Sequence, residues 1–100
     1  MRRAARVDSN HKEIVTYLRK LCCQVLDISQ LKNCADLVVK CHNKVVLVEI
    51  KDGQKPPSAR KLTTGEQKFH DEWSGSVFMV LDLSDVIALV SEMELNQLKN

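Results

Sequence analysis

Residues 35–52 read ADLVVKCHNKVVLVEIKD, and this stretch decides the fold that we expect. Two apolar runs, 36–40 and 44–51, flank the pair His42-Asn43, a pattern typical of a β-hairpin with a short turn. Over residues 45–50 both alternating faces are apolar. We therefore expect the second strand to be central in its sheet and covered on both sides.

A helix precedes this hairpin. Apolar residues recur at i, i+3, i+4 and i+7, the spacing of one helical face: Ile14, Tyr17, Leu18 and Leu21. Asn10 and Glu13 stand in the positions of a capping box at its start. Residues 24–28 then predict a short strand.

Downstream, Thr63 and Glu66 predict the start of a second helix, with Phe69 and Trp73 on its buried side. Residues 77–81 predict a strand, and Ser84 begins a last helix over about 84–96. The order is α-β-β-β-α-β-α, which defines an α/β fold with a mixed central sheet flanked by helices. A chain of 100 residues allows one domain, spanning 1–100 with a basic N-terminal arm over 1–7.

Composition limits the function classes. Hydrophobic residues make up 44% of the chain, which favours a folded domain, and a net charge of +2 does not by itself indicate a nucleic-acid partner. The four cysteines (22, 23, 34 and 41) lack C-x-x-C spacing, so we expect reduced thiols and no assigned role for them. No apolar run is long enough to span a membrane, and none follows the N-terminal arginines as in a signal peptide. We expect a cytoplasmic protein that is not secreted.

The charged residues of the hairpin carry the chemistry. A two-residue turn at His42-Asn43 sets a register that pairs Cys41 with Lys44, Val39 with Val46 and Asp36 with Glu49. Lys51 lies two residues beyond Glu49 and shares its face. Two carboxylates and one ammonium are therefore expected to converge at one end of an apolar hairpin.

This convergence is costly unless something offsets it. Two carboxylates about 5 Å apart repel by roughly 3 kcal/mol at an effective dielectric constant near 20. Lys51 offsets part of the repulsion, and Mg²⁺ or Mn²⁺, which prefer hard oxygen ligands, would offset the rest. Such an ion activates water and stabilises charge on a phosphate oxygen, and Lys51 would assist. The alternative is an ordinary charged strand end without a function.

These residues resemble a known signature. Asp36, followed after about a dozen residues by Glu49-x-Lys51, with Glu13 on an upstream helix, looks like the PD-(D/E)xK nuclease motif. More narrowly, residues 8–81 resemble the virus-type replication-repair nuclease (VRR-NUC) domains. The supporting segments are ADLVV at 35–39, VEIKDG at 48–53, and Leu62-Thr63-x-x-Glu66-Gln67-x-Phe69-His70-x-x-Trp73. One departure is Ala35, which stands where proline is usual, after Cys34 where a small residue is common.

The resemblance implies a restriction-endonuclease-like fold and metal-dependent hydrolysis of DNA phosphodiester bonds. Asp36, Glu49 and the backbone carbonyl of Ile50 would bind Mg²⁺ or Mn²⁺, and Lys51 would be the catalytic lysine. Glu13 would complete the metal site, directly or through a water, and Gln67 would face it. Related stand-alone domains act as dimers that cut four-way DNA (Holliday) junctions in bacterial or phage-infected cells. The residues also permit plainer roles, with Glu13 only capping its helix, Gln67 solvated, and His70 on the surface.

Basic residues predict where DNA would lie. They fall into the N-terminal arm and the loop after Lys51: Arg2, Arg3 and Arg6, then Lys55, Arg60 and Lys61. Each group is equally compatible with a solvated charged surface. Ile87 and Leu95 widen the apolar stripe of the last helix, which favours a homodimer. Three alternatives to a junction resolvase stay open: a nuclease acting on flaps, nicks or single strands, a non-catalytic DNA-binding module, and a structural interaction domain.

Overall fold

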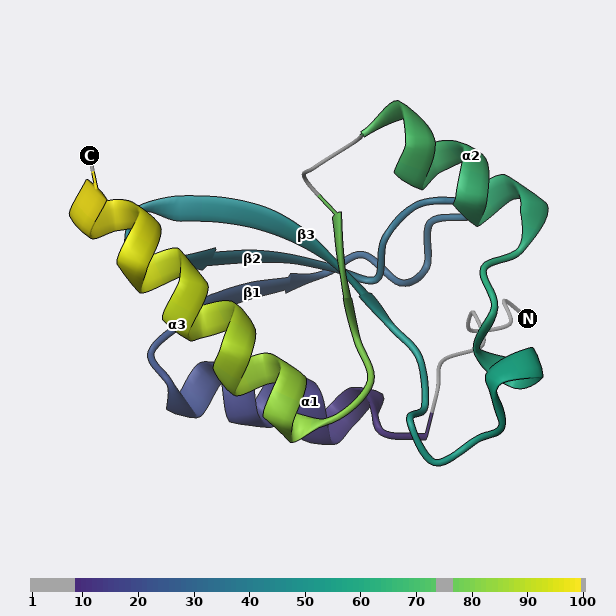
Figure 1. Cartoon of the computed structure of the whole chain (residues 1–100), viewed down its shortest axis with the longest axis horizontal. Coiled ribbons are helices and arrows are strands. Elements are labelled where there is room, and N and C mark those ends of the chain that lie inside the picture. Colours follow the sequence, from purple (N-terminus) through teal and green to yellow (C-terminus); the bar gives the residue numbers. More distant parts are fainter. Residues whose placement is uncertain (1–8, 74–76, 100) are drawn as a thin grey trace.

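A computed structural model describes residues 9–73 and 77–99 of the chain (Figure 1). Its elements in chain order are α1 (His11–Lys20), β1 (Gln24–Asp27), β2 (Leu37–Cys41), β3 (Lys44–Ile50), the 3₁₀ helix η1 (Pro57–Arg60), α2 (Thr64–Glu72), β4 (Val77–Val80) and α3 (Leu83–Lys99). The strands form one sheet in the order β1-β2-β3-β4, with β1, β2 and β3 antiparallel and β4 parallel to β3. The predicted α/β class, element order and mixed sheet are confirmed.

The hairpin of β2 and β3 has the predicted turn and the predicted pairs Cys41–Lys44 and Val39–Val46, whereas the predicted pair Asp36–Glu49 is not part of the ladder. His42 and Asn43 have φ angles of 52° and 64°, the left-handed conformation that a tight two-residue hairpin turn requires. The strand pairing runs from Cys41 opposite Lys44 to Leu37 opposite Val48, where the regular ladder ends. Asp36, one residue further, donates its backbone N–H to the Val48 carbonyl at 2.9 Å.

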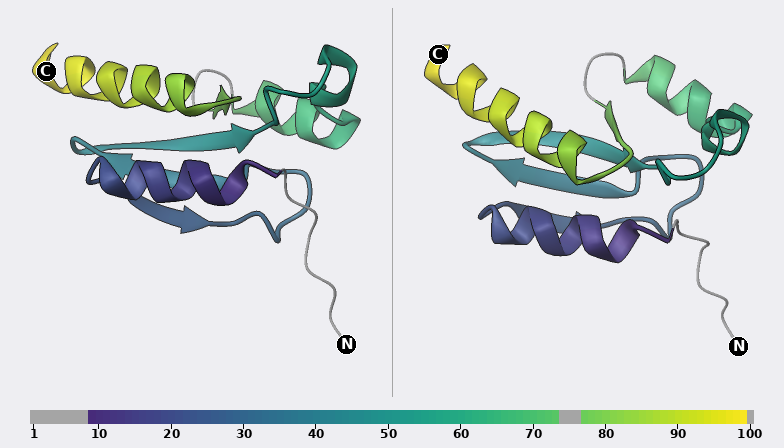
Figure 2. Two further views of the ribbon diagram at one scale, coloured as in Figure 1. Left: turned by 90° about the horizontal axis from the view of Figure 1, so that it is seen from below. Right: turned by 60° about the horizontal axis from the view of Figure 1, so that its bottom comes forward.

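One face of the sheet holds the core. Helices α1 and α3 contact each other on this face, with α1 against β1 and α3 against β2 and β4 (Figures 1 and 2). The inward residues of the strands and helices are almost fully buried: Leu37, Val39, Val48, Ile50 and Val80 from the sheet, and Ile14, Leu18, Val86 and Leu89 from the helices. Burial of about ten such side chains is the main stabilising contribution to the fold.

The opposite face of the sheet is apolar and largely open. Leu26, Val45 and Met79 lie on it, one from each of three strands, and all three are exposed. The prediction that β3 is covered on both sides is therefore correct only for its second half, Val48–Ile50, because Val45 is 63% exposed. On the other side of the first half of β3, Val46 packs against the core.

The predicted caps of α1 and α3 are wrong in detail. Asn10 precedes α1 but makes no side-chain capping bond; its amide Nδ2 instead donates to the carbonyls of Lys51 (3.2 Å) and Leu81 (2.9 Å). Tertiary contacts thus outcompete the local capping box with Glu13. Helix α3 begins at Leu83 rather than at 84, because Asp82 Oδ1 accepts the backbone N–H of Asp85 at 3.0 Å.

Candidate metal centre

Asp36 is fixed to the strand that carries Glu49. Its carboxylate Oδ2 accepts the backbone N–H of Ile50 at 2.7 Å, and its own carbonyl accepts the N–H of Ile28 at 2.8 Å. Ala35 beside it is buried. The charge of Asp36 and a side-chain hydrogen bond with it both raise the pKa of Glu49, so the two carboxyl groups lie near each other. Their role as metal ligands stays a prediction.

Lys51 lies next to this pair and is itself paired. Its Nζ atom is 3.1 Å from Glu66 Oε1, and both side chains are mostly buried. Its backbone is held by a hydrogen bond from its N–H to the Val80 carbonyl at 3.1 Å. Lys51 shares the open face of the sheet with Glu49, as the alternation of β3 predicts.

Helix α2 covers this end of the open face with two side chains. Glu66 pairs with Lys51, and His70 Nε2 lies 3.4 Å from Glu49 Oε1. Four residues of helix advance about 6 Å, and two residues of strand advance about 6.7 Å. One turn of α2 therefore matches the Glu49–Lys51 spacing of β3, and the two contacts form together.

A capping box fixes the start of α2 and the position of Glu66. Thr63 and Glu66 form the predicted capping box, with the Glu66 N–H donating to Thr63 Oγ1 at 3.2 Å and the Thr63 N–H donating to Glu66 Oε1 at 2.9 Å. No residue of α2 is fully buried, and the predicted core position of Trp73 is wrong, since its side chain stacks on Phe69 but is 51% exposed. Polar contacts, rather than an apolar stripe, thus orient this helix.

Burial dominates the electrostatics of the centre. Glu49 is 2% exposed, and burial raises its pKa from an ordinary 4.5 to about 9, helped by the charges of Asp36 and Glu66 and opposed by the Lys51 ammonium. Burial also favours a raised pKa for Glu66, but its bonds to Thr63 and Lys51 outweigh this and lower the pKa. Burial lowers the pKa of His70, against the charges of Glu66 and Asp71. Burial thus favours the protonated form of Glu49.

Two predicted site residues, Glu13 and Gln67, lie apart from Asp36 and Glu49. Glu13 is exposed on α1 and lines a surface hollow with Asp52 and Gly53. It does not complete a three-carboxylate group with Asp36 and Glu49, and its predicted role in the metal site is not supported by this arrangement.

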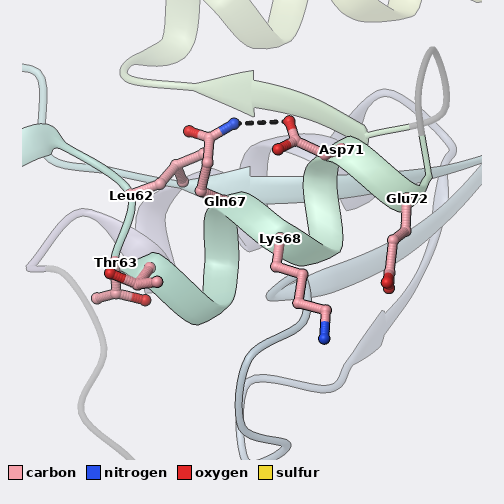
Figure 3. Close-up of a pocket in the computed structure, with 7 residues that line it drawn as sticks. Leu62, Thr63, Gln67, Lys68, Asp71 and Glu72 are labelled. Atoms are coloured by element: carbon pink, nitrogen blue, oxygen red, sulfur yellow. Dashed lines mark hydrogen bonds between the residues drawn. The ribbon is translucent and has the colours of Figure 1, made fainter.

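Gln67 is the second predicted site residue that lies apart from Asp36 and Glu49. It is exposed, and its Nε2 donates to Asp71 Oδ1 at 2.8 Å on the outer side of α2 (Figure 3). These two residues line a shallow hollow with Thr63 and Lys68. The residue that α2 places beside Lys51 is its neighbour Glu66, so the predicted position of Gln67 facing the site is wrong by one residue, a rotation of about 100° around the helix.

Ile50 reaches the centre through its backbone. Its N–H is the donor to Asp36 Oδ2, while the metal contact expected of its carbonyl stays a prediction. Of the predicted DNA-binding residues, Arg2, Arg3 and Arg6 lie outside the described residues. Lys55, Arg60 and Lys61 lie on the segment that joins β3 to α2. Arg60 is the last residue of η1 and is half-buried, whereas Lys55 and Lys61 lie outside η1 and are exposed.

The donor set fits a hard divalent cation. Among residues 9–73 and 77–99, no three His, Cys, Asp or Glu side chains are grouped so as to hold a metal ion. Mg²⁺, however, is usually bound by one or two carboxylates and keeps several waters. Asp36 and Glu49 meet that requirement, and burial followed by the charge of Asp36 raises the pKa of Glu49.

Sequence reasoning missed two residues of the centre. Glu66 was assigned only to a cap, and His70 was expected on the surface. A signal was available for both, because Glu66 and His70 are four residues apart and share one helix face, as Glu49 and Lys51 share one strand face. Whether this face of α2 packs on that face of the strand is decided by tertiary contacts.

No protein-family model, curated protein or solved structure matched this chain. None of the helices in the described part of the chain combines the length and hydrophobicity that a bilayer crossing requires.

Proposed function

We propose that this chain is a Mg²⁺- or Mn²⁺-dependent endodeoxyribonuclease that hydrolyses phosphodiester bonds in branched DNA, with the Holliday junction as substrate. The observation that carries the proposal is the proximity of the half-buried Asp36 to the buried Glu49, with Lys51 two residues further on. A buried acid beside a second carboxyl group is costly for a fold of this size, and such costs are typical of functional sites.

We assign the fold to the restriction-endonuclease-like class and the chain to the VRR-NUC domains. The support is the element order, the mixed four-stranded sheet, and the position of the Asp…Glu-x-Lys residues at one end of its central hairpin. The sequence segments at 35–39, 48–53 and 62–73 support the same assignment.

In this function each residue of the centre has a distinct task. Asp36 and Glu49 would hold the cation, which when bound supplies Lewis-acid stabilisation of a phosphate oxygen and a more acidic water. The Lys51 ammonium is compact and positively charged, so it orients the attacking water and offsets charge that develops on the phosphate. Glu66 holds Lys51 in place through the 3.1 Å contact.

The basic residues beside the centre suit a phosphate backbone. Lys55 and Lys61 are exposed on the segment that links β3 with α2, and both therefore lie in the chain between Lys51 and Glu66. Lysine and arginine side chains bind phosphates without reading sequence, which suits an enzyme that recognises the shape of a junction.

A homodimer is part of the proposal, because a four-way junction presents two equivalent strands to cut. Ile87 and Leu95 of α3 are exposed, as are Leu26, Val45 and Met79 on the open sheet face. Sedimentation equilibrium at micromolar concentration is expected to give a dimer, and a monomer would exclude symmetric paired cutting by the protein alone.

The test is cleavage of a synthetic four-way junction by the full chain with Mn²⁺, beside flap, nicked, single-stranded and linear duplex DNA. Glu49→Ala and Lys51→Ala are expected to lower cleavage at least about 100-fold while binding stays largely intact. Lys40→Ala, which removes an exposed lysine of β2, is the matched control and should cleave normally.

The outcomes separate the alternatives. Preference for flaps, nicks or single strands would change the substrate but keep the chemistry. Junction binding that needs no divalent ion and gives no cleavage would indicate a non-catalytic module. Full activity of Glu49→Ala would contradict the proposed centre.

A further inference from the structure

His70 approaches Glu49 from the helix that covers the centre. Its Nε2 atom lies 3.4 Å from Glu49 Oε1, and both side chains are mostly or fully buried. The imidazole also lies edge-on to Phe69, with ring centroids 6.3 Å apart and an interplanar angle of 73°. The ring is therefore restrained on one edge by Phe69 while another edge faces the carboxylate.

The chemistry of this contact depends on the state of Glu49. A carboxylate that binds a cation is ionised and can only accept hydrogen bonds. The imidazole nitrogen that faces it must then be the N–H donor, which places the proton of a neutral His70 on Nε2. A donor on one oxygen fixes the rotation of the carboxylate and leaves its other lone pairs for the cation.

We propose that His70 is a positioning residue that holds the Glu49 carboxylate in one orientation for metal binding. This inference rests on the proposed function, since it assigns Glu49 to the metal. Outer partners of metal ligands generally contribute about 10- to 100-fold to metal affinity, because a freely rotating ligand must be ordered when the metal binds. Loss of the Nε2 donor should therefore weaken Mn²⁺ binding by about tenfold or more.

The experiment measures Mn²⁺ affinity of the full chain by electron paramagnetic resonance of the free ion, so that it does not depend on cleavage. His70→Phe keeps a ring without a donor and is expected to bind Mn²⁺ at least about tenfold more weakly than the wild type. His70→Gln places an amide N–H near the position of Nε2 and should recover most of the affinity. Should circular dichroism show that His70→Phe does not fold, His70→Met takes its place as the variant without a donor.

His42→Asn is the matched control. It removes a histidine from the hairpin turn, where φ is 52° and asparagine is tolerated, and where the ring is near Glu94 rather than the centre. It should bind Mn²⁺ as the wild type does. A merely structural role for His70 would lower thermal stability in His70→Gln and His70→Phe without the recovery of affinity by glutamine.

Two results would overturn the inference, and they are distinguishable. Wild-type affinity in a folded His70→Phe or His70→Met would exclude the positioning role alone. Absence of Mn²⁺ binding by the wild type, or equal binding by Glu49→Gln, would exclude the metal centre itself and the role of His70 with it.

Discussion

Glu66 Oε1 lies 3.1 Å from Lys51 Nζ, and the same oxygen accepts the backbone N–H of Thr63 at 2.9 Å. One carboxylate thus both caps α2 and holds the lysine of the candidate centre. The start of the helix and the position of the ammonium are coupled through this single atom.

The two roles of Glu66 can be separated by substitution. Glu66→Gln keeps a capping-box side chain, so its melting temperature should stay close to that of the wild type, but it loses the charge that holds Lys51. Glu66→Ala loses the cap as well and should be less stable by about 1 kcal/mol. Both should lower junction cleavage about tenfold or more, measured at saturating Mn²⁺.

Glu72→Gln, at the exposed end of α2, is the control for both variants. Equal cleavage by Glu66→Gln and Glu72→Gln would show that the charge of Glu66 is not used.

The contribution of Glu49 to metal-free stability should fall as pH rises. The folded state raises the pKa of Glu49 from 4.5 to about 9, so it retains a proton that the unfolded chain releases above its ordinary pKa. The contribution of Glu49 to stability is therefore complete below pH 4.5 and is lost progressively as pH rises towards 9. Glu49→Gln, which is neutral throughout, should raise the melting temperature at pH 8 by about 5 °C or more and much less at pH 4.5.

Melting curves at several pH values in the presence of a chelator measure this effect. Glu72→Gln should follow the wild type at every pH. A Glu49→Gln variant that is less stable than the wild type at pH 8 would mean that Glu49 is ionised and well compensated in the metal-free fold.

The first turn of α2 approaches the loop before β2 closely. A Cβ atom added at Gly65 would collide with the side chain of Asn33, whose φ of 56° is left-handed. Glycine to alanine in an unobstructed helix stabilises by about 0.5–1 kcal/mol. Here we expect a smaller gain from Gly65→Ala, with cleavage close to that of the wild type, because the exposed Asn33 amide must first rotate away.

A second substitution tests the cause. Asn33→Gly removes the obstructing side chain and suits the left-handed backbone, so Gly65→Ala should give its full gain in stability in the Asn33→Gly background. Thermal melts and junction cleavage of the two single variants and the double variant make the comparison. An equal gain from Gly65→Ala with and without Asn33 would show that the amide rotates away without cost.

Neighbouring cysteines should differ sharply in reactivity. Cys22 is exposed, whereas Cys23 is buried next to Cys41, and burial, reinforced by a hydrogen bond with Cys41, raises the pKa of Cys23 to about 12. Because the thiolate is the nucleophile, Cys23 should react with a disulfide reagent at least about 100-fold more slowly than Cys22 in the folded protein.

Cys22→Ser should remove the fast phase, and all four thiols should react in denaturant. Fast reaction of Cys23 in the folded chain would mean that the chain opens readily just before β1.

Much of the fold follows from local pattern. The turn residues His42 and Asn43 tolerate positive φ, which fixes a two-residue turn, and the apolar runs on either side then pair in one register. Because side chains alternate along strands, that register brings Asp36 to Glu49 and puts Lys51 on the same face. The capping box of Thr63 and Glu66 is local in the same sense and was predicted correctly.

The predictions that the structure contradicts failed for a common physical reason. Asn10 satisfies carbonyls of Lys51 and Leu81 instead of its own helix, because those distant groups lie within its reach once the sheet has formed. Sequence pattern gives the hydrogen-bonding capacity of such a side chain but not which of several partners it will meet.

Three short-range features of the sequence were enough to bring two acids and a lysine together on a hairpin. They are apolar alternation, a turn that permits left-handed φ, and one capping box. The placement of α2 was not encoded in this way, because that helix has no fully buried residue and hence no apolar stripe from which its docked face can be read. Tertiary packing selected the face of α2 with Glu66 and His70, rather than the face with Gln67, to lie against the sheet. One helical turn matches two residues of strand in length, so both polar contacts form at once.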